Sequence, residues 1–206
     1  MRRSWTLVAM GICLLGAASS VSAQGSGRSG TLTVTACLPC HGGGGAAGAQ
    51  AAAPTFPKLD GQHADYLAKQ LREYKSGKRK SAIMAPLIGA LKKGDIPGMA
   101  AHFASQTPAP GAVQNSELAT RGKVLYEEGN RASGVPGCIG CHQANGAGSP
   151  RYPRLAGQSQ TYTVQQLVDF KSGARSNDRA RVMRHVAGRL TDDEMKAVAE
   201  YVAGLQ

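Results

Sequence analysis

Apolar residues recur at helical spacing in two matching stretches of the chain. Residues 63–76 and 160–172 place apolar side chains three or four positions apart, which favours amphipathic helices with one face against a core. Gly77 and Gly173 follow directly, and glycine at this position often ends a helix because it adopts left-handed backbone angles at little cost. The pattern therefore predicts two helices with glycine caps.

Two further helices are predicted in the second half of the chain. Residues 117–128 form the first of them. Thr191 stands three positions before Glu194 in a capping box, which predicts the start of a last helix. No stretch shows the strict alternation of apolar and polar residues that is typical of strands, so the sequence predicts an all-α protein.

The two amphipathic stretches belong to a longer internal repeat. The segment Phe-Pro-Lys-Leu-Asp-Gly-Gln at 56–62 corresponds to Tyr-Pro-Arg-Leu-Ala-Gly-Gln at 152–158. At the same spacing, further identical residues match in pairs: Tyr66 with Tyr162, Gln70 with Gln166, Leu71 with Leu167, Lys75 with Lys171, Ser76 with Ser172, Gly77 with Gly173, and Arg79 with Arg175. Self-similarity of this kind indicates an internal duplication, with two copies of one structural unit.

A short segment divides the two copies. Residues 106–116 contain two prolines and a glycine, a composition that disfavours helix and strand and suits an interdomain linker. The sequence therefore predicts two tandem domains, an N-terminal one at 24–105 and a C-terminal one at 117–206.

Residues 1–23 have the features of a secretory signal peptide. Two arginines precede an apolar run at 7–18, and Val-Ser-Ala at 21–23 forms a small-residue cleavage site. This run is short for the ~20 apolar residues that span a bilayer, so cleavage is favoured over retention as an anchor. The mature chain is expected to be exported, and it contains no later apolar segment long enough to enter a membrane.

The pentapeptide Cys-x-x-Cys-His occurs once in each half of the chain. The two copies consist of Cys37, Cys40 and His41 and of Cys138, Cys141 and His142. This motif is the signature of covalent attachment of a c-type haem, in which two thiols bind the porphyrin and the adjacent imidazole ligates the iron. The sequence therefore predicts two covalently attached haem c groups.

Other uses of these cysteines explain the pattern less well. A four-thiolate zinc site would leave both following histidines without a role, and a thioredoxin-like dithiol would need a βαβ context that the Gly/Ala-rich flanks do not supply. Cys13 would leave with the signal peptide. Because the haem motifs use the remaining four cysteines, no disulfide is expected.

The duplication also points to the second axial ligand of each iron. Methionine thioether is a common partner of histidine in cytochromes c. Met84 and Met183 are the only methionines that occupy equivalent positions in the two copies, and we predict that they ligate the iron. His63, His102 and His185 are the rival ligands, but none of them has an equivalent histidine in the other copy.

Two prolines are candidates for orienting the ligating histidines. A metal-bound histidine usually donates its second ring proton to a fixed acceptor. Pro57 and Pro153 each begin a Pro-x-Leu segment shortly after a haem motif, and their carbonyl groups are held by a restricted backbone. The prolines either accept this hydrogen bond or only shape the turn.

Two pairs of repeated polar residues are candidates for contact with the haem propionates. Arg79 and Arg175, together with Tyr66 and Tyr162, stand beside the apolar faces of the predicted helices. Guanidinium and phenol groups are good hydrogen-bond donors to carboxylates. The alternative is that these residues are ordinary solvated or packing residues.

Taken together, these motifs resemble the dihaem cytochrome c4 family. The resemblance covers essentially all of the mature chain and rests on both haem motifs, the repeated Pro-x-Leu-x-Gly-Gln segment, the Lys-Ser-Gly-x-Arg stretch and the paired methionines. It implies two cytochrome c-like domains with His/Met ligation of both irons, and haems near the domain interface. It also implies electron delivery in the periplasm towards a terminal oxidase.

Filled coordination positions favour electron transfer over catalysis. An iron with two axial protein ligands has no open site for a small-molecule substrate, so we expect an electron carrier rather than an enzyme. Two alternatives remain: the cytochrome subunit of a periplasmic dehydrogenase, such as a flavocytochrome that oxidises sulfide, and a dihaem peroxidase. A peroxidase would normally have a longer chain.

The charge of the chain gives a weak indication of its partners. It contains 24 Lys and Arg against 13 Asp and Glu, for a formal net charge of +11. A basic surface can steer docking to an acidic redox protein or allow peripheral association with an anionic membrane, although solubilising charge explains it as well. Nucleic acid is not expected as the partner of an exported protein. Two basic clusters stand out: Lys75, Lys78, Arg79 and Lys80, and Arg175, Arg179, Arg181 and Arg184.

Overall fold

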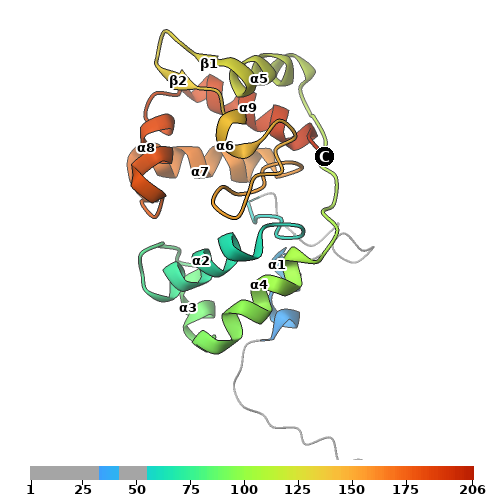
Figure 1. Ribbon diagram of the computed structural model, residues 1–206, viewed down its shortest axis with the longest axis vertical. Helices are drawn as coiled ribbons and strands as arrows, with labels where there is room; N and C mark the ends of the chain where they lie inside the picture. The colour runs from blue at the N-terminus through green and yellow to red at the C-terminus, as the bar shows by residue number, and fades with distance from the viewer. Residues whose placement is uncertain (1–32, 42–54) are drawn as a thin grey trace, which may run out of the picture.

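The computed structural model describes residues 33–41 and 55–206 and contains two stacked groups of helices (Figure 1). The N-terminal group comprises η1 (Val34–Ala36), α1 (Leu38–His41), α2 (Ala64–Lys75), α3 (Met84–Gly89), η2 (Lys93–Asp95) and α4 (Ile96–Ala104). The C-terminal group comprises α5 (Ser116–Glu128), β1 (Gly129–Asn130), β2 (Val135–Pro136), α6 (Ile139–His142), α7 (Gln160–Ser172), η3 (Arg179–Arg181), α8 (Val182–Ala187) and α9 (Asp192–Gly204). The predicted signal peptide lies outside the described residues.

Helices dominate the described part of the chain, as the sequence predicts. The one exception there is an antiparallel hairpin of two-residue strands, in which Gly129 pairs with Pro136 and Asn130 with Val135. Strands this short are below the length at which an alternating pattern can be recognised. The all-α prediction is confirmed, with this hairpin as a local addition.

The predicted amphipathic helices correspond to α2 and α7. The side chain of Ser159 accepts a hydrogen bond from the backbone N–H of Tyr162 and so caps the start of α7. Gly173 caps its end in the left-handed conformation, with φ of 80°. The cap of α2 differs from the prediction, because Ser76 occupies it and the left-handed Gly77 comes one residue later.

The C-terminal domain is organised around the contact between α5 and α9. The capping box predicted at Thr191 and Glu194 is present at the start of α9. Gly122 in α5 lies so close to α9 that an added Cβ would collide with the carbonyl oxygen of Ala197. The buried core of this domain consists of Leu125, Tyr126, Val135, Leu167, Phe170, Ala187, Leu190, Met195, Val198 and Val202.

The N-terminal domain has a separate core, formed mainly by α2, α3 and α4. Its buried residues are Leu67, Ala68, Ile88, Leu91, Ile96, Met99, Ala100 and Phe103. Two independent cores are what a duplicated structural unit should produce. The domain boundaries given above stay a prediction.

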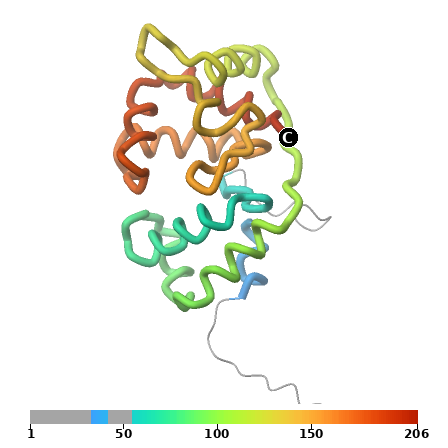
Figure 2. Tube along the Cα trace, viewed as in Figure 1, coloured from blue at the N-terminus to red at the C-terminus, as the bar shows by residue number. Residues whose placement is uncertain are grey.

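The segment between α4 and α5 packs against both domains and runs along one side of the molecule (Figure 2). The ammonium of Lys58 donates to the carbonyl oxygen of Pro110 at 3.0 Å, which ties the segment to the N-terminal domain. The backbone N–H of Gln114 donates to Glu200 in α9 at 2.9 Å. This connection is therefore a fixed structural element in the described chain. None of the described helices has the length and apolar character needed to cross a bilayer.

Candidate haem-binding sites

Each Cys-x-x-Cys-His motif forms a single helical turn. The backbone N–H of His41 donates to the carbonyl oxygen of Cys37 at 2.9 Å, and that of His142 donates to Cys138 at 2.9 Å. All four motif cysteines are partly buried, and none of them forms a disulfide. Each backbone bond joins residues four positions apart, so the first cysteine and the histidine of each motif lie on the same side of the helical turn.

Both motif histidines are buried and held by the predicted proline carbonyls. The Nδ1–H of His41 donates to the carbonyl oxygen of Pro57 at 2.9 Å, and that of His142 donates to Pro153 at the same distance. Because a carbonyl oxygen can only accept, Nδ1 must carry the ring proton, which leaves the lone pair of Nε2 available for a metal. The acceptor role proposed for the two prolines is confirmed.

The surroundings of both histidines favour the neutral imidazole. Burial lowers the pKa of His41 and of His142, and the proline carbonyls oppose this effect only in part. An aromatic ring stands edge-on to each imidazole, Phe56 at 6.2 Å and Tyr152 at 6.1 Å between ring centroids. The neutral form is the one that ligates metals, so the electrostatics fit the predicted role.

In the N-terminal domain the predicted haem residues meet in one cavity of about 340 Å³. Cys37, Cys40, His41 and Met84 all line it, although Met84 is far from the motif in sequence. Most of the remaining lining is apolar, including Leu67, Leu71, Ile88, Leu91 and Phe103. Two thiols, an imidazole and a thioether around an apolar cavity form the donor set that a covalently bound haem requires.

A second methionine lines the same cavity. The Sδ of Met99 lies 3.9 Å from the Sγ of Cys37, and the residue is buried. Its position at the wall of the cavity was not apparent in the sequence. Met99 has no methionine in the equivalent position of the C-terminal domain, where Val198 belongs to the core. Met84 therefore remains the predicted ligand and Met99 provides a control.

The second predicted site has the same components around the C-terminal core. Cys138, Leu155, Met183 and Val186 are partly buried and pack against that core. Burial raises the pKa of Cys138 to about 11, as expected for a thiol in apolar surroundings.

The three rival histidines have other environments. The Nε2 of His63 lies 2.8 Å from the carbonyl oxygen of Ala147, so this ring links the two domains. His102 stands edge-on to Phe103, and His185 is exposed on α8. None of the three lines the cavity of the first site. Within 33–41 and 55–206 no group of three or more His, Cys, Asp and Glu residues is arranged to hold a metal ion.

Arg79 and Arg175 lie in the interface between the two domains, which corrects their assignment to surface basic clusters. Each is only 8% exposed. Arg79 donates to Tyr162 at 3.1 Å and to Gln166 at 2.9 Å across the interface. Arg175 reciprocates with Tyr66 at 2.9 Å and with Gln70 at 3.2 Å.

Two glutamines form a second reciprocal contact. Gln62 donates to the carbonyl oxygen of Arg154 at 3.0 Å and accepts from its N–H at 2.8 Å. Gln158 makes the equivalent pair of bonds with Lys58, both at 3.1 Å. These residues recur in the repeat, but the sequence alone did not indicate that they face each other across a domain boundary.

The first haem cavity also borders the C-terminal domain. Tyr162, Gln166 and Asp169 of α7 contribute to its lining. The predicted haem environment of the N-terminal domain is thus completed by its neighbour. Asp169 was not singled out in the sequence, because the equivalent residue of the other copy is Glu73 and no pattern marks either of them.

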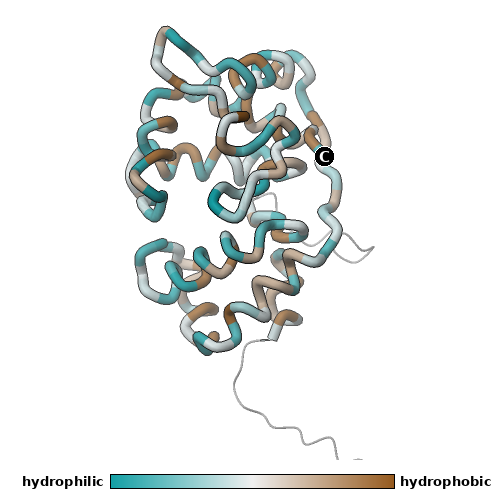
Figure 3. The backbone as a smooth tube through the Cα atoms, viewed as in Figure 1, coloured by the Kyte–Doolittle hydropathy of each residue, from teal (hydrophilic) through white to brown (hydrophobic). Residues whose placement is uncertain are grey.

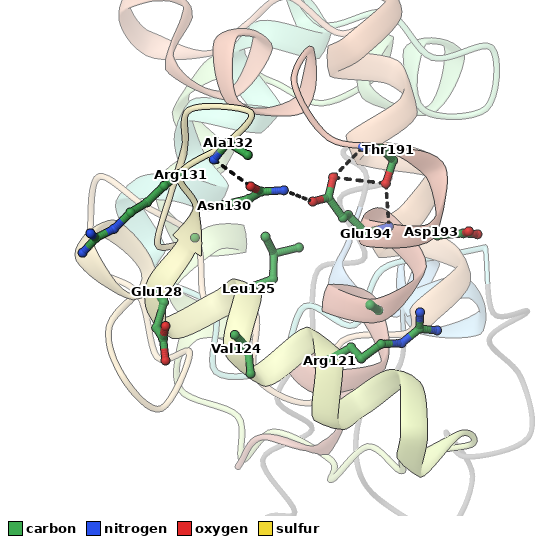
Figure 4. Close-up of a pocket in the computed structure, with 12 residues that line it drawn as sticks. Arg121, Val124, Leu125, Glu128, Asn130, Arg131, Ala132, Thr191, Asp193 and Glu194 are labelled. Carbon is green, nitrogen blue, oxygen red and sulfur yellow. Dashed lines mark hydrogen bonds between the residues drawn. The ribbon is translucent and has the colours of Figure 1, made fainter.

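A separate hollow of about 950 Å³ lies between α5, the hairpin and the start of α9 (Figure 4). Asn130 donates to Glu194 at 2.7 Å, and Glu194 accepts from the N–H of Thr191 at 2.8 Å. These bonds fasten the hairpin to the capping box. None of the predicted haem ligands lines this hollow, so we assign it a structural role.

Comparison with known proteins agrees with these observations. The family model "Cytochrome c" matches residues 29–111 and again 119–206. Cytochrome c4 from Azotobacter vinelandii is 37% identical over 211 residues, which cover 97% of this chain and 96% of the relative. A thiosulfate dehydrogenase electron acceptor from Stutzerimonas stutzeri is 39% identical over 174 residues, covering 82% and 79%. The crystal structure of reduced recombinant cytochrome c4 from Pseudomonas stutzeri superimposes with a TM-score of 0.77 at 37% identity, covering 84% of this chain and 95% of that one. With its two tandem cytochrome c domains and two covalently attached haem c groups, the chain belongs to the cytochrome c4 family of electron-transfer proteins.

Proposed function

We propose that this chain is a periplasmic dihaem electron carrier that delivers electrons towards a terminal oxidase. In this proposal the thiols of Cys37, Cys40, Cys138 and Cys141 attach the haems, and His41, Met84, His142 and Met183 are the axial iron ligands. The main support is the single cavity shared by the first motif and Met84. When bound, the haem iron supplies a reversible one-electron change of oxidation state.

The role of the protein is to orient the iron ligands and to keep other molecules away from the iron. The carbonyl groups of Pro57 and Pro153 orient the two imidazoles, and the apolar lining of the first cavity excludes water. With both axial positions filled by side chains, no site remains for a small-molecule substrate. We therefore expect electron exchange with other redox proteins and no catalysis by this chain alone.

Arg79 and Arg175 are suited to receive haem propionates. Both guanidinium groups are buried, and no carboxylate in the described part of the chain forms an ion pair with either of them. Their present partners are neutral amides and phenols. A buried cation is stabilised by a nearby anion, and carboxylates accept strong hydrogen bonds from arginine. Propionates at the domain interface would supply that anion.

Ligation by methionine is tested by replacing it. Met84→Ala and Met183→Ala should each remove about half of the sulfur-to-iron charge-transfer band of the oxidised protein, because one of two thioether bonds is lost. Met99→Ala is the matched control, since it truncates a methionine in the same cavity. Retention of the full band in Met84→Ala, or its loss in Met99→Ala, would contradict the assignment.

Two further measurements test the carrier role itself. Intact-protein mass spectrometry should find two haems bound to each polypeptide. Carbon monoxide should bind the reduced wild-type protein slowly or not at all, because both axial positions are filled. Rapid binding to either ferrous centre would identify an open coordination site and favour an enzyme.

A second candidate function is the electron acceptor of a periplasmic dehydrogenase. It is supported by the similarity to the thiosulfate dehydrogenase electron acceptor, and the flavocytochrome alternative belongs to the same class. To separate the candidates, the oxidised protein is mixed with a thiosulfate dehydrogenase and thiosulfate, and the reduced protein with membranes that contain a terminal oxidase. Faster reduction by the dehydrogenase would identify its electron acceptor, and faster oxidation by the membranes would identify a donor to the oxidase.

A further inference from the structure

The two helices that carry the predicted methionine ligands differ in their surface chemistry. Met84 begins α3 and Met183 is the second residue of α8. Around these methionines, four exposed uncharged residues of the first copy correspond to four cationic or titratable residues of the second: Ala82 to Arg181, Ala85 to Arg184, Pro86 to His185, and Ala90 to Arg189. The duplication therefore offers an internal comparison in which the ligand is kept and its surroundings are changed.

The surface of α3 is apolar. Ile83 is 56% exposed and Leu87 is 45% exposed, and the helix itself contains no charged residue. On α8 the equivalent of Ile83 is Val182, which is 39% exposed. Arg181 directly precedes this valine, and Arg184 follows it by two positions. Figure 3 shows hydrophilic residues in the turn that leads into α8. The two surfaces would attract different molecules.

An open depression of about 920 Å³ lies against α8. Its lining includes Arg181, Arg184, Arg189 and His185 around the apolar Val182. Pro136, two residues before Cys138, also contributes to it. The lining therefore includes residues close in sequence to the second haem motif and, through Val182 and Arg184, to Met183. We call Arg179, Arg181, Arg184, His185 and Arg189 together the α8 basic surface.

Most of the positive charge of this surface is not neutralised within the protein. Arg184 forms an ion pair with the buried Asp178, with 2.7 Å between Nε and Oδ1. Arg179, Arg181 and Arg189 form no ion pair with any residue of the described chain. All four cations are arginines, whose planar guanidinium groups bind carboxylates through two hydrogen bonds.

The backbone before α8 adopts an uncommon conformation that places Arg181 at the start of the helix. Ala180 and Arg181 have φ of 51° and 60°, in the left-handed region that side chains other than glycine rarely adopt. This connection is longer than its counterpart, because eight positions separate Arg175 from Met183 whereas five separate Arg79 from Met84. The added residues lie between Arg175 and Arg181, in the segment that carries Arg179.

We propose that the α8 basic surface is the docking site for an acidic redox protein that exchanges electrons with the C-terminal domain. The inference rests on the proposed carrier function and adds the surface at which one partner binds. One exposed valine lies among arginines in the same depression, which suits a small acidic protein surface. A membrane contact would need larger apolar side chains to enter the lipid.

The test uses the purified holoprotein and an acidic blue-copper protein, plastocyanin, as the probe. The charge-reducing variant is Arg181→Asn/Arg189→Ala, in which asparagine tolerates the left-handed backbone and alanine reproduces the residue at position 90. The matched control, Lys93→Gln/Arg121→Gln, removes two exposed cations that do not line the depression and form no ion pair in the described chain. Stopped-flow oxidation of the reduced proteins is measured over a range of ionic strength.

Oxidation of the Arg181→Asn/Arg189→Ala variant at low ionic strength should be about 10-fold slower than that of the wild type, with a weaker dependence on salt. The control variant should stay within about 2-fold of the wild type, because neither of its charges belongs to the docking site. Equal rates for the two variants, or a wild-type rate that does not depend on salt, would overturn the proposal.

Vesicle binding separates a protein partner from a membrane. Each protein is mixed with phosphatidylcholine vesicles with and without phosphatidylglycerol. Loss of binding to the anionic vesicles in the α8 variant, with oxidation by plastocyanin unchanged, would assign the surface to a membrane and overturn the proposal. Failure of the carrier function would appear differently, as rapid carbon monoxide binding by the wild type.

Discussion

The two domains share the setting of their motif histidines and differ, among the described residues, in the helices that carry the predicted methionine ligands. In both, a proline carbonyl holds the motif histidine at 2.9 Å, and an aromatic ring stands edge-on to the imidazole. Outside this inner set, the C-terminal domain has the long α5–α9 contact, the hairpin and the arginines of α8, whereas the N-terminal domain presents an apolar α3. The duplication has preserved the setting of the motif histidines and changed the surfaces of α3 and α8.

The arginines and glutamines at the interface between the domains match in the two copies, unlike the surfaces of α3 and α8. Their contacts are reciprocal. Arg79 and Gln62 of the N-terminal domain bind residues of the C-terminal domain, and their repeat equivalents Arg175 and Gln158 bind residues of the N-terminal domain. A change at one of these residues therefore affects contacts made by both domains.

The largest predicted effect is the loss of one haem from one domain. Cys37→Ala/Cys40→Ala and Cys138→Ala/Cys141→Ala should each carry one haem per chain by mass spectrometry, because no thiol remains to form the thioether bonds. The first variant should also lose more helicity in far-ultraviolet circular dichroism. Its core surrounds the cavity, whereas α5 and α9 of the other domain pack directly against each other.

Equal loss of helicity in the two cysteine variants would contradict this difference between the domains. A variant that still carried two covalently bound haems would contradict the attachment sites themselves. Unchanged binding in the other domain serves as the internal control, since each variant retains one intact motif.

The two covalent haems and the helices at 63–76 and 160–172 could be predicted because they depend on local spacing and on the repeat, whereas ligation by Met84 and Met183 stays a prediction. The burial of Arg79 and Arg175 could not. Both belong to basic stretches, and nothing in a local pattern separates an arginine in an interface from its exposed neighbours. The contribution of Asp169 to the first cavity also depends on how the domains pack, which no residue spacing records.

The second largest effect is expected at the reciprocal interface. Arg79→Gln should lower the free energy of unfolding by about 1–3 kcal/mol, because Gln70, Tyr162 and Gln166 lose their donor in a buried setting. Arg175→Gln should have a similar effect, and the double variant should cost less than the sum. Denaturant unfolding of the holoproteins gives these values.

Strictly additive losses in this cycle would show that the two arginines act independently. Arg72→Gln provides the control, since this arginine is exposed on the same helix as Gln70 and should change stability little.

A smaller effect is expected from acid. Burial raises the pKa of Glu73, but hydrogen bonds from Lys69 and Asn177 outweigh it and leave the pKa below its ordinary value. A carboxylate with a lowered folded-state pKa stabilises the protein above its unfolded-state pKa of about 4.5. This contribution is lost as the pH falls through the lower folded-state pKa. Because Asn177 belongs to the other domain, the loss should loosen the interface.

The acid effect is measured as the midpoint of thermal unfolding between pH 7 and pH 3. Glu73→Gln should flatten this profile at the acid end, because glutamine cannot titrate. Glu194→Gln is the comparison within the C-terminal domain, since the pKa of Glu194 is also lowered, through the backbone of Thr191 and the side chain of Asn130. An unchanged acid profile in Glu73→Gln would exclude this carboxylate as the source.

The smallest predicted effect distinguishes the last helices of the two domains. The side chain of Thr191 caps α9 within a complete capping box, whereas Asp95 before α4 makes no capping hydrogen bond. Thr191→Ala should therefore lower the free energy of unfolding by about 1 kcal/mol, and Asp95→Ala should change it less. Denaturant unfolding monitored by circular dichroism would resolve the difference. Equal losses would mean that the hydrogen bonds of the capping box add no stability to α9 beyond what packing against α5 supplies.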